Sequence, residues 1–228
     1  MRIVSYNIRK AKGTDRRRAP GRILDILNKL DPDVVLLQEA DLRLGARPAA
    51  LPPGLIESAT DFEVAPLAVS DVSIGWHGNA ILVRRGLGIL RTERIDLPAL
   101  EPRGAVLAEV AGPSGPVTVI GAHLALLRPW RRRQVAALAR RLGQDAGPAS
   151  LVAGDFNEWS PKKGLEALAE SHEILAPGRS FHARRPVSAL DRFAIGQGLE
   201  VVAAGVDQSP LAQRGSDHLP IWAEIARR

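Results

Sequence analysis

Apolar residues fall into short runs along this chain, separated by polar segments rich in glycine and proline. Val34–Leu37 and Leu151–Ala153 are continuously apolar, which is typical of strands buried on both faces of a sheet. Between residues 20 and 30 the apolar positions instead follow helical spacing, and Asp31-Pro32 ends the pattern. The chain therefore predicts both buried strands and amphipathic helices.

A second amphipathic helix is predicted over residues 129–142, with arginines on the solvent side and a buried stripe of Val135, Leu138, Ala139 and Leu142. Ser160-Pro161 predicts the start of a helix over 161–170, with His172 at the surface in its tail. The proline-rich stretch 41–75 predicts an irregular loop region. Further strands are predicted at 2–8, Ala80–Val83, Ala105–Val110, Val117–Gly121, Val201–Ala204 and Ile221–Ile225.

This order contains more strands than a doubly wound fold, and its connections are too irregular for a barrel. It fits two packed sheets with helices on their outer faces. No repeat or long linker divides the sequence, so we expect residues 1–228 to form a single domain.

Composition narrows the possible chemistry. The chain has no cysteine, which excludes disulfides, thiolate metal sites and a cysteine nucleophile. The N-terminus lacks the apolar stretch of a signal peptide, and no segment approaches the roughly 20 apolar residues of a membrane span. We therefore expect a cytoplasmic, monomeric protein without a transmembrane segment.

The formal net charge is +6, and arginine supplies most of it, with clusters at Arg16–Arg18 and Arg131–Arg133. One interpretation is a surface that faces a polyanion, because guanidinium groups bind phosphates. An arginine-rich coding bias, spread over solvated faces, explains the charge equally well.

Polar residues suited to phosphate chemistry stand at or just past several apolar runs. These positions are Ser5-Tyr6-Asn7, Gln38-Glu39, Gly121-Ala122-His123-Leu124, Gly154-Asp155-Phe156-Asn157, Leu190-Asp191-Arg192-Phe193 and Gly215-Ser216-Asp217-His218-Leu219-Pro220. Oxygen ligands for a hard cation and His–Asp pairs for proton transfer are what metal-assisted phosphate hydrolysis requires. In an extended segment Asp155 and Asn157 point the same way, whereas the adjacent Asp217 and His218 need separate partners.

The ordered set resembles the endonuclease/exonuclease/phosphatase superfamily from Asn7 to His218, with Gly-Asp-Phe-Asn and Ser-Asp-His-x-Pro as its most specific parts. The resemblance implies a four-layer α/β/β/α sandwich of two packed, mostly antiparallel sheets and hydrolysis of phosphoesters with Mg²⁺, for which Mn²⁺ is a possible substitute. It makes Glu39 the main metal ligand and assigns Asn7 and Asp217 to the metal side.

The same resemblance assigns the remaining roles. Asp155 orients the nucleophile or assists the leaving group, and Asn157 holds the phosphate. His218 is the general base, oriented by Asp191 as in a catalytic triad. His123 stabilises the phosphate, with a satisfied core histidine as the alternative, and Arg103 and Asn79 contact the substrate, with turn residues as the alternative.

The sequence is compatible with more than one class of substrate. The basic charge and Trp76, Trp130 and Trp159 favour a nuclease, because indoles stack on bases. The compact chain favours a lipid-headgroup or small-molecule phosphodiesterase or phosphatase, and the run from Arg185 to Arg192 resembles compact bacterial members. A non-catalytic binding module is the third alternative, and it would require loss of a catalytic residue, whereas all of them are present.

Overall fold

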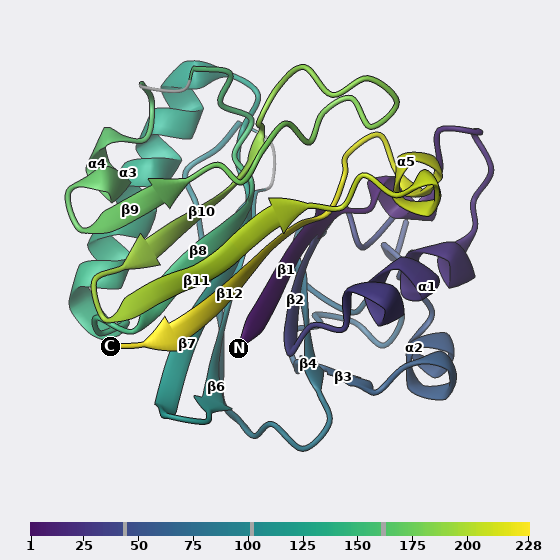
Figure 1. Ribbon diagram of the computed structural model, residues 1–228, viewed down its shortest axis with the longest axis horizontal. Coiled ribbons are helices and arrows are strands. Elements are labelled where there is room, and N and C mark those ends of the chain that lie inside the picture. Colours follow the sequence, from purple (N-terminus) through teal and green to yellow (C-terminus); the bar gives the residue numbers. More distant parts are fainter. Residues whose placement is uncertain (43–44, 101–102, 161–162) are drawn as a thin grey trace.

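The computed structural model describes residues 1–42, 45–100, 103–160 and 163–228. Two six-stranded sheets pack against each other, and helices cover their outer faces (Figure 1). The first sheet runs in the order β11 (Leu199–Val206), β12 (Ile221–Arg227), β1 (Arg2–Asn7), β2 (Val34–Gln38), β4 (Ala80–Arg84) and β3 (Phe62–Val64). The second runs β5 (Ile89–Asp96), β6 (Gly104–Gly112), β7 (Gly115–His123), β8 (Ser150–Asp155), β10 (Asp191–Gly196) and β9 (His172–Leu175). The predicted sandwich is confirmed.

The helices divide between the two outer faces. Beside the first sheet lie η1 (Arg9–Ala11), α1 (Pro20–Leu30), α2 (Pro53–Ala59) and α5 (Pro210–Gly215), whereas α3 (Arg128–Asp145) and α4 (Glu166–Ala169) lie beside the second (Figure 1). None of the helices in the described part of the chain combines the length and the apolarity needed to span a bilayer.

Strand β2 shows why the sequence of a strand buried on both faces is continuously apolar. Val34 and Leu36 belong to the core between the two sheets, and Val35 and Leu37 belong to the core under α1. Alternate side chains of one strand therefore fill two different layers. A third core lies between the second sheet and α3, where Val135, Leu138 and Leu142 are buried as predicted.

Several local predictions were wrong. The stretch 41–75, predicted as irregular, contains α2 and β3, and the helix predicted over 161–170 is reduced to α4. Leu165 rather than Ser160 precedes α4, and Pro161 lies outside the described residues. His172 is buried at the start of β9, where its ring nitrogens lie 3.2 Å from Ser150 Oγ and 2.8 Å from Ser171 Oγ. Tertiary strand pairing overrides the local pattern at these positions.

Candidate active site

The polar positions singled out in the sequence meet at one edge of the sandwich. Parallel pairing of β1 with β2 places Asn7 opposite Gln38, which precedes Glu39. Parallel pairing of β7 with β8 places His123 opposite Asp155, and antiparallel β10 begins here with Asp191 opposite Asp155. This edge lies in the upper half of the molecule in Figure 1.

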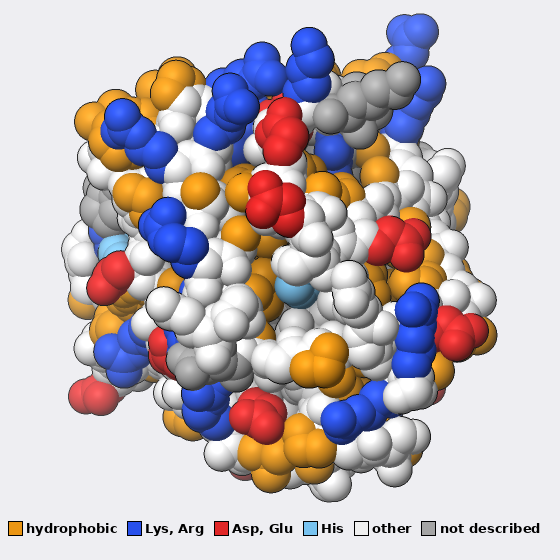
Figure 2. Space-filling model, turned by 90° about the vertical axis from the view of Figure 1, so that its left-hand side faces the viewer, with side chains coloured by type: hydrophobic (Ala, Val, Ile, Leu, Met, Phe, Trp, Pro, Cys, Tyr) orange, Lys and Arg blue, Asp and Glu red, His pale blue; other side chains and the backbone are white. Residues whose placement is uncertain are grey.

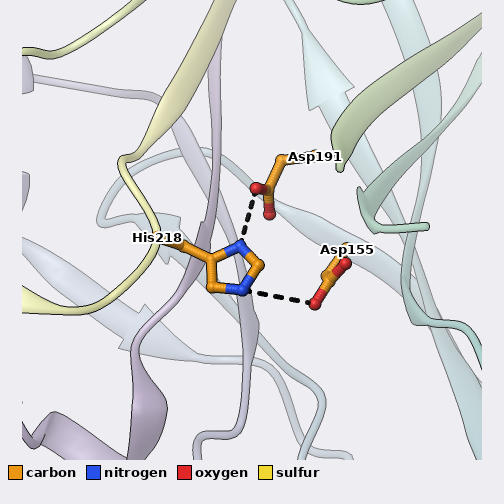
Figure 3. Close-up of side chains that lie close together, drawn as sticks. All are labelled: Asp155, Asp191 and His218. Atoms are coloured by element: carbon orange, nitrogen blue, oxygen red, sulfur yellow. Dashed lines mark hydrogen bonds and ion pairs between the residues drawn. The ribbon is translucent and has the colours of Figure 1, made fainter. Parts of the chain in front are cut away.

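His218 lies between two carboxylates that come from neighbouring strands (Figure 3). Its Nδ1 is 2.8 Å from Asp191 Oδ2, and its Nε2 is 3.6 Å from Asp155 Oδ2. The Ser180 hydroxyl also donates to Asp191 Oδ2 at 2.5 Å, and Ser180 and Asp191 are fully buried. The orientation of the imidazole is thus fixed from the Asp191 side, which leaves Nε2 facing the rest of the site.

The electrostatics of the site follow from this arrangement. Burial alone lowers the pKa of His218, but the Asp191 and Asp155 carboxylates outweigh burial and raise it to about 10. Burial raises the pKa of Asp155, against the opposing effect of His218 and His123. The surroundings of His218 therefore favour the imidazolium form.

Asp155 is the centre of the hydrogen-bond network. Its Oδ2 accepts from Asn7 Nδ2 at 3.1 Å and lies 3.3 Å from His123 Nε2. Its Oδ1 accepts from the Asn157 backbone amide at 3.0 Å. Five of the predicted catalytic residues and Asn7 are therefore brought together around buried carboxylates, with Asn7 reaching across from the other sheet.

The backbone around Asp155 is unusual in two ways. A Cβ on Gly154 would lie 1.7 Å from the carbonyl oxygen of Ala122 in β7, so only glycine allows this approach. Asn157 has φ +51°, so the segment from Asp155 is a turn and not extended as predicted. The turn still places Asn157 beside Asp155, and Asn157 Nδ2 donates to the Leu124 carbonyl at 2.9 Å.

The three predicted metal ligands surround η1. Glu39, which also has a left-handed φ of +53°, forms an ion pair with Lys10, and Asp217 Oδ2 lies 3.2 Å from Arg9 Nε. Asn7 Oδ1 accepts from the Arg9 backbone amide at 3.1 Å. Two carboxylates and an amide oxygen are a donor set that suits a hard divalent cation. The Arg9 and Lys10 side chains provide the positive charge that these carboxylates contact in this structure.

A second group is also capable of holding a metal. One ligand atom from each of Asp155, Asp191 and His218 lies within 4.8 Å of the other two. Because both ring nitrogens of His218 face carboxylate oxygens, this group equally suits proton transfer.

Arg103 and Asn79 lie at the same edge. Arg103 directly precedes β6, and Asn79 is buried, with its Nδ2 donating to the Gly104 carbonyl at 3.0 Å. This bond ties the start of β4 to the start of β6, which supports the structural alternative for Asn79.

Sequence reasoning missed Arg131 and its partners. Arg131, grouped with Arg132 and Arg133 as a candidate polyanion contact, is only 4% exposed. Its Nη2 lies 2.9 Å from Glu158 Oε2, and its Nη1 donates to the Ala125 and Leu126 carbonyls. The prediction that all three arginines reach solvent is therefore wrong for Arg131, because a buried acid 27 residues away pairs with it.

The fold and the site together are those of two-sheet, metal-dependent phosphoesterases. The chain belongs to the endonuclease/exonuclease/phosphatase family, whose model matches residues 4–218. Members of this family are hydrolases of phosphoester bonds that depend on divalent metal ions.

Individual relatives agree with this assignment. The chain is 28% identical over 249 residues to the uncharacterized protein YbhP of Escherichia coli (strain K12), covering 98% of this chain and 95% of YbhP. The mannosyl-6-phosphatase Bt3783 of Bacteroides thetaiotaomicron superposes with a TM-score of 0.78 at 17% identity, covering 99% of both chains. D. rerio TDP2 in complex with a single-strand DNA product gives a TM-score of 0.71 at 17% identity, covering 99% of this chain and 98% of TDP2.

Proposed function

We propose that this protein is a Mg²⁺-dependent phosphodiesterase that cleaves P–O bonds by in-line attack of water, with nucleic acid as its substrate. The observation that carries the proposal is the convergence of Asn7, His123, Asp155, Asn157, Asp191 and His218 at one edge, with contacts of 2.8–3.6 Å between them. Buried carboxylates, imidazoles and amides at such distances suit a charged, tetrahedral phosphate.

Glu39, Asp217 and Asn7 are the residues that would hold the cation, because they offer oxygen ligands beside one short turn. A bound divalent cation would stabilise negative charge on the phosphate oxygens and assist formation of a nucleophile from water. Lys10 and Arg9 pair with Glu39 and Asp217 and take no further part in the reaction.

The chain's own residues divide the remaining work. Asn157 and His123 donate hydrogen bonds to the phosphate, and Asp191 orients His218 through Nδ1. The sequence predicts His218 as the general base. Its two carboxylate neighbours favour the protonated ring, which better supports charge stabilisation at the phosphate through Nε2. In that case Asp155, whose carboxylate faces the same space, accepts the proton of the attacking water.

Two observations support nucleic acid as the substrate. The chain has a net charge of +6, and Lys and Arg side chains gather along the upper edge of the face in Figure 2, the edge at which α3 begins in Figure 1. A neighbour in fold, D. rerio TDP2, was solved with a single-strand DNA product. Clustered cations beside a catalytic edge favour a polyanionic chain over a small ester.

One specific observation favours a lipid headgroup as the second candidate. Leu100, Leu126 and Leu127 are 71%, 72% and 58% exposed, and they line one groove together with Arg103 and Trp130. Exposed aliphatic side chains next to cations suit the surface of a membrane.

A substrate panel tests both candidates. Purified protein with Mg²⁺ is assayed on single-stranded DNA, plasmid DNA, RNA, sphingomyelin vesicles and inositol phosphates, and each assay is repeated in EDTA. We expect metal-dependent release of oligonucleotides. Turnover confined to the vesicles would select the second candidate, and unchanged turnover in EDTA would contradict the metal mechanism.

A further inference from the structure

An exposed tryptophan lies beside the catalytic edge. Trp159 is 63% exposed, and its ring lies 6.2 Å from that of Phe181 in an edge-to-face arrangement. The Phe181 ring is in turn 4.9 Å from the His218 imidazole. Trp159 also follows Asn157 by only two positions in the chain. The indole is therefore next to the residues that handle the phosphate.

The backbone on both sides of Trp159 is held by a buried arginine. Arg192, only 4% exposed, donates from Nη2 to the Glu158 carbonyl at 2.7 Å and to the Ser160 carbonyl at 2.9 Å. The Ser160 amide donates to Glu158 Oε1 at 2.8 Å, and Arg131 holds the other oxygen of that carboxylate. Hydrogen bonds thus fix the main chain before and after a side chain that itself faces solvent.

A large aromatic side chain that is exposed yet held on a fixed backbone has no evident role in the core. The other two candidate stacking tryptophans differ from it. Trp76 packs its ring against Gly104, where a Cβ would lie 2.2 Å from Trp76 Cζ3. Trp130 is half-buried, and the Arg133 guanidinium lies over its indole, with Cζ 4.8 Å from the centroid of the Trp130 ring. Trp159 is therefore the best placed of the three to contact a substrate.

We propose that Trp159, supported by Phe181, forms a subsite that stacks on the nucleobase next to the scissile phosphate. An aromatic side chain on a fixed backbone, with a second ring at its edge, has little conformational freedom to lose when a ligand binds. Every nucleobase has a planar π-face, and stacking on it does not depend on base identity. The subsite therefore gives affinity for nucleotides without sequence preference. This inference rests on the proposed function, because it names the group attached to the phosphate.

Arg192 and Glu158 are positioning residues in this picture. They touch the backbone around Trp159 and Arg131 and do not reach the reacting atoms. Arg192 also follows Asp191 directly, so the same start of β10 supplies the partner of His218 and the support of Trp159. The phosphate site and the base subsite are tied to one strand.

A pair of matched substrates tests the inference. Single-stranded thymidine oligonucleotides are compared with oligonucleotides that carry abasic tetrahydrofuran residues around one cleavable phosphate, both with Mg²⁺. For Trp159→Ala we expect KM to rise on the first substrate by roughly 5- to 150-fold, which corresponds to about 1–3 kcal/mol. On the abasic substrate KM should stay near the wild-type value. Trp159→Phe should recover most of the loss.

A matched control separates stacking from a general loss of exposed apolar surface. Leu90 is 55% exposed at the start of β5, whose partner register with the end of β6 places it at the opposite end of the sheet. Leu90→Ala should leave KM unchanged on both substrates. An equal rise in KM for Trp159→Ala on the normal and abasic substrates would overturn the base subsite.

Tryptophan fluorescence gives a readout that does not require turnover. Thymidine 5′-monophosphate should quench the wild-type protein more than it quenches Trp159→Phe, whereas deoxyribose 5-phosphate should quench neither. Equal quenching of both proteins by the nucleotide would overturn the inference. The inference would also fail if hexose 6-phosphate quenched the Trp159 fluorescence and the nucleotide did not. If no phosphodiester is hydrolysed at all, the proposed function fails, and the quenching measurement still decides on the subsite.

Discussion

The imidazole of His218 and the carboxylate of Asp191 lie 2.8 Å apart, with both residues buried and Ser180 donating to the same carboxylate oxygen. Because the proposed mechanism uses Nε2 of the Asp191-bound ring to stabilise charge on the phosphate, we expect His218→Ala to lower kcat by about 10²–10³-fold. Asp191→Asn should lower kcat in the same direction, because a neutral amide no longer stabilises the imidazolium form of His218. Steady-state kinetics on the best substrate of the panel measure both effects.

The two losses should also be non-additive. If Asp191 acts only through His218, the double variant loses no more than the worse single variant. A loss equal to the product of the two single losses would contradict this pairing. Asp61→Asn, an exposed residue before β3, is the matched control and should keep full activity.

Removal of a metal ligand should abolish turnover without unfolding the protein. Glu39→Gln removes one charge from the turn around η1, so we expect weaker Mg²⁺ binding by calorimetry and a fall in kcat of at least about 100-fold. Circular dichroism should be unchanged. Glu63→Gln, on the exposed side of β3, should behave like the wild type. Mg²⁺ binding of wild-type strength in Glu39→Gln would instead favour the group of Asp155, Asp191 and His218 as the metal site.

The buried ion pair of Arg131 with Glu158 predicts a large effect on stability. Arg131→Ala leaves a carboxylate buried without its partner, and such a change costs about 3–5 kcal/mol of unfolding free energy. Denaturant titration should show a lower midpoint. Arg132→Ala, at an exposed position of the same helix, should change the free energy by less than about 0.5 kcal/mol. Equal stability of the two variants would mean that the buried pair is not maintained in solution.

Arg132 and Arg133 are left as the exposed cations of the cluster. If they neutralise phosphates of a polynucleotide, replacing both with Ala should reduce the slope of log K against log salt by roughly 1 for each phosphate that is no longer neutralised. Fluorescence anisotropy with labelled single-stranded DNA at several salt concentrations measures the slope. An unchanged slope would mean that these arginines only solvate α3.

His172 predicts a pH effect on stability that is separate from the active site. Burial lowers its pKa below the ordinary value of 6.5, so the unfolded chain takes up this proton before the folded protein does. Stability is therefore unaffected well above pH 6.5 and falls as the pH drops through and below that value. The loss of Tm between about pH 8 and about pH 5 should be smaller in His172→Gln than in the wild type. In the control His182→Gln, a half-exposed loop position, this loss should match the wild type.

Sequence reasoning predicted the layered fold because buried strands such as β2 and β8 leave an unmistakable apolar run, and each run ends directly in a polar motif. The resemblance to the family, carried by these motifs, predicted which side chains converge. Sequence reasoning did not predict β3, β5, β9 or β10, because charged residues stand among the apolar ones in these short strands and the mixture fits several structures. Nor did it find Ser180, which precedes Asp191 by 11 positions and has no local signal of its contact.

The roles of charged residues were harder to predict than the positions of the strands. Arg131, Arg132 and Arg133 are identical in the sequence, yet only Arg131 turns inward to meet Glu158. Helical periodicity indicates which side of α3 faces the sheet, but it does not tell where a buried acid from another loop will lie. The same holds for Arg192. Its partners are backbone carbonyls, and the amino-acid sequence does not show which carbonyls will lie within its reach.

The hydrogen bond from Asn7 to Asp155 joins the last residue of β1 to the last residue of β8, and these strands belong to different sheets. No half of the molecule therefore contains a complete set of site residues. Small shifts of one sheet across the other, caused by a cavity such as Val110→Ala at the opposite end of the core between the sheets, will misalign the two halves before either sheet unfolds. Catalytic rate is thus a sensitive gauge of how tightly the two sheets are docked, and heat should abolish it below the temperature at which secondary structure is lost.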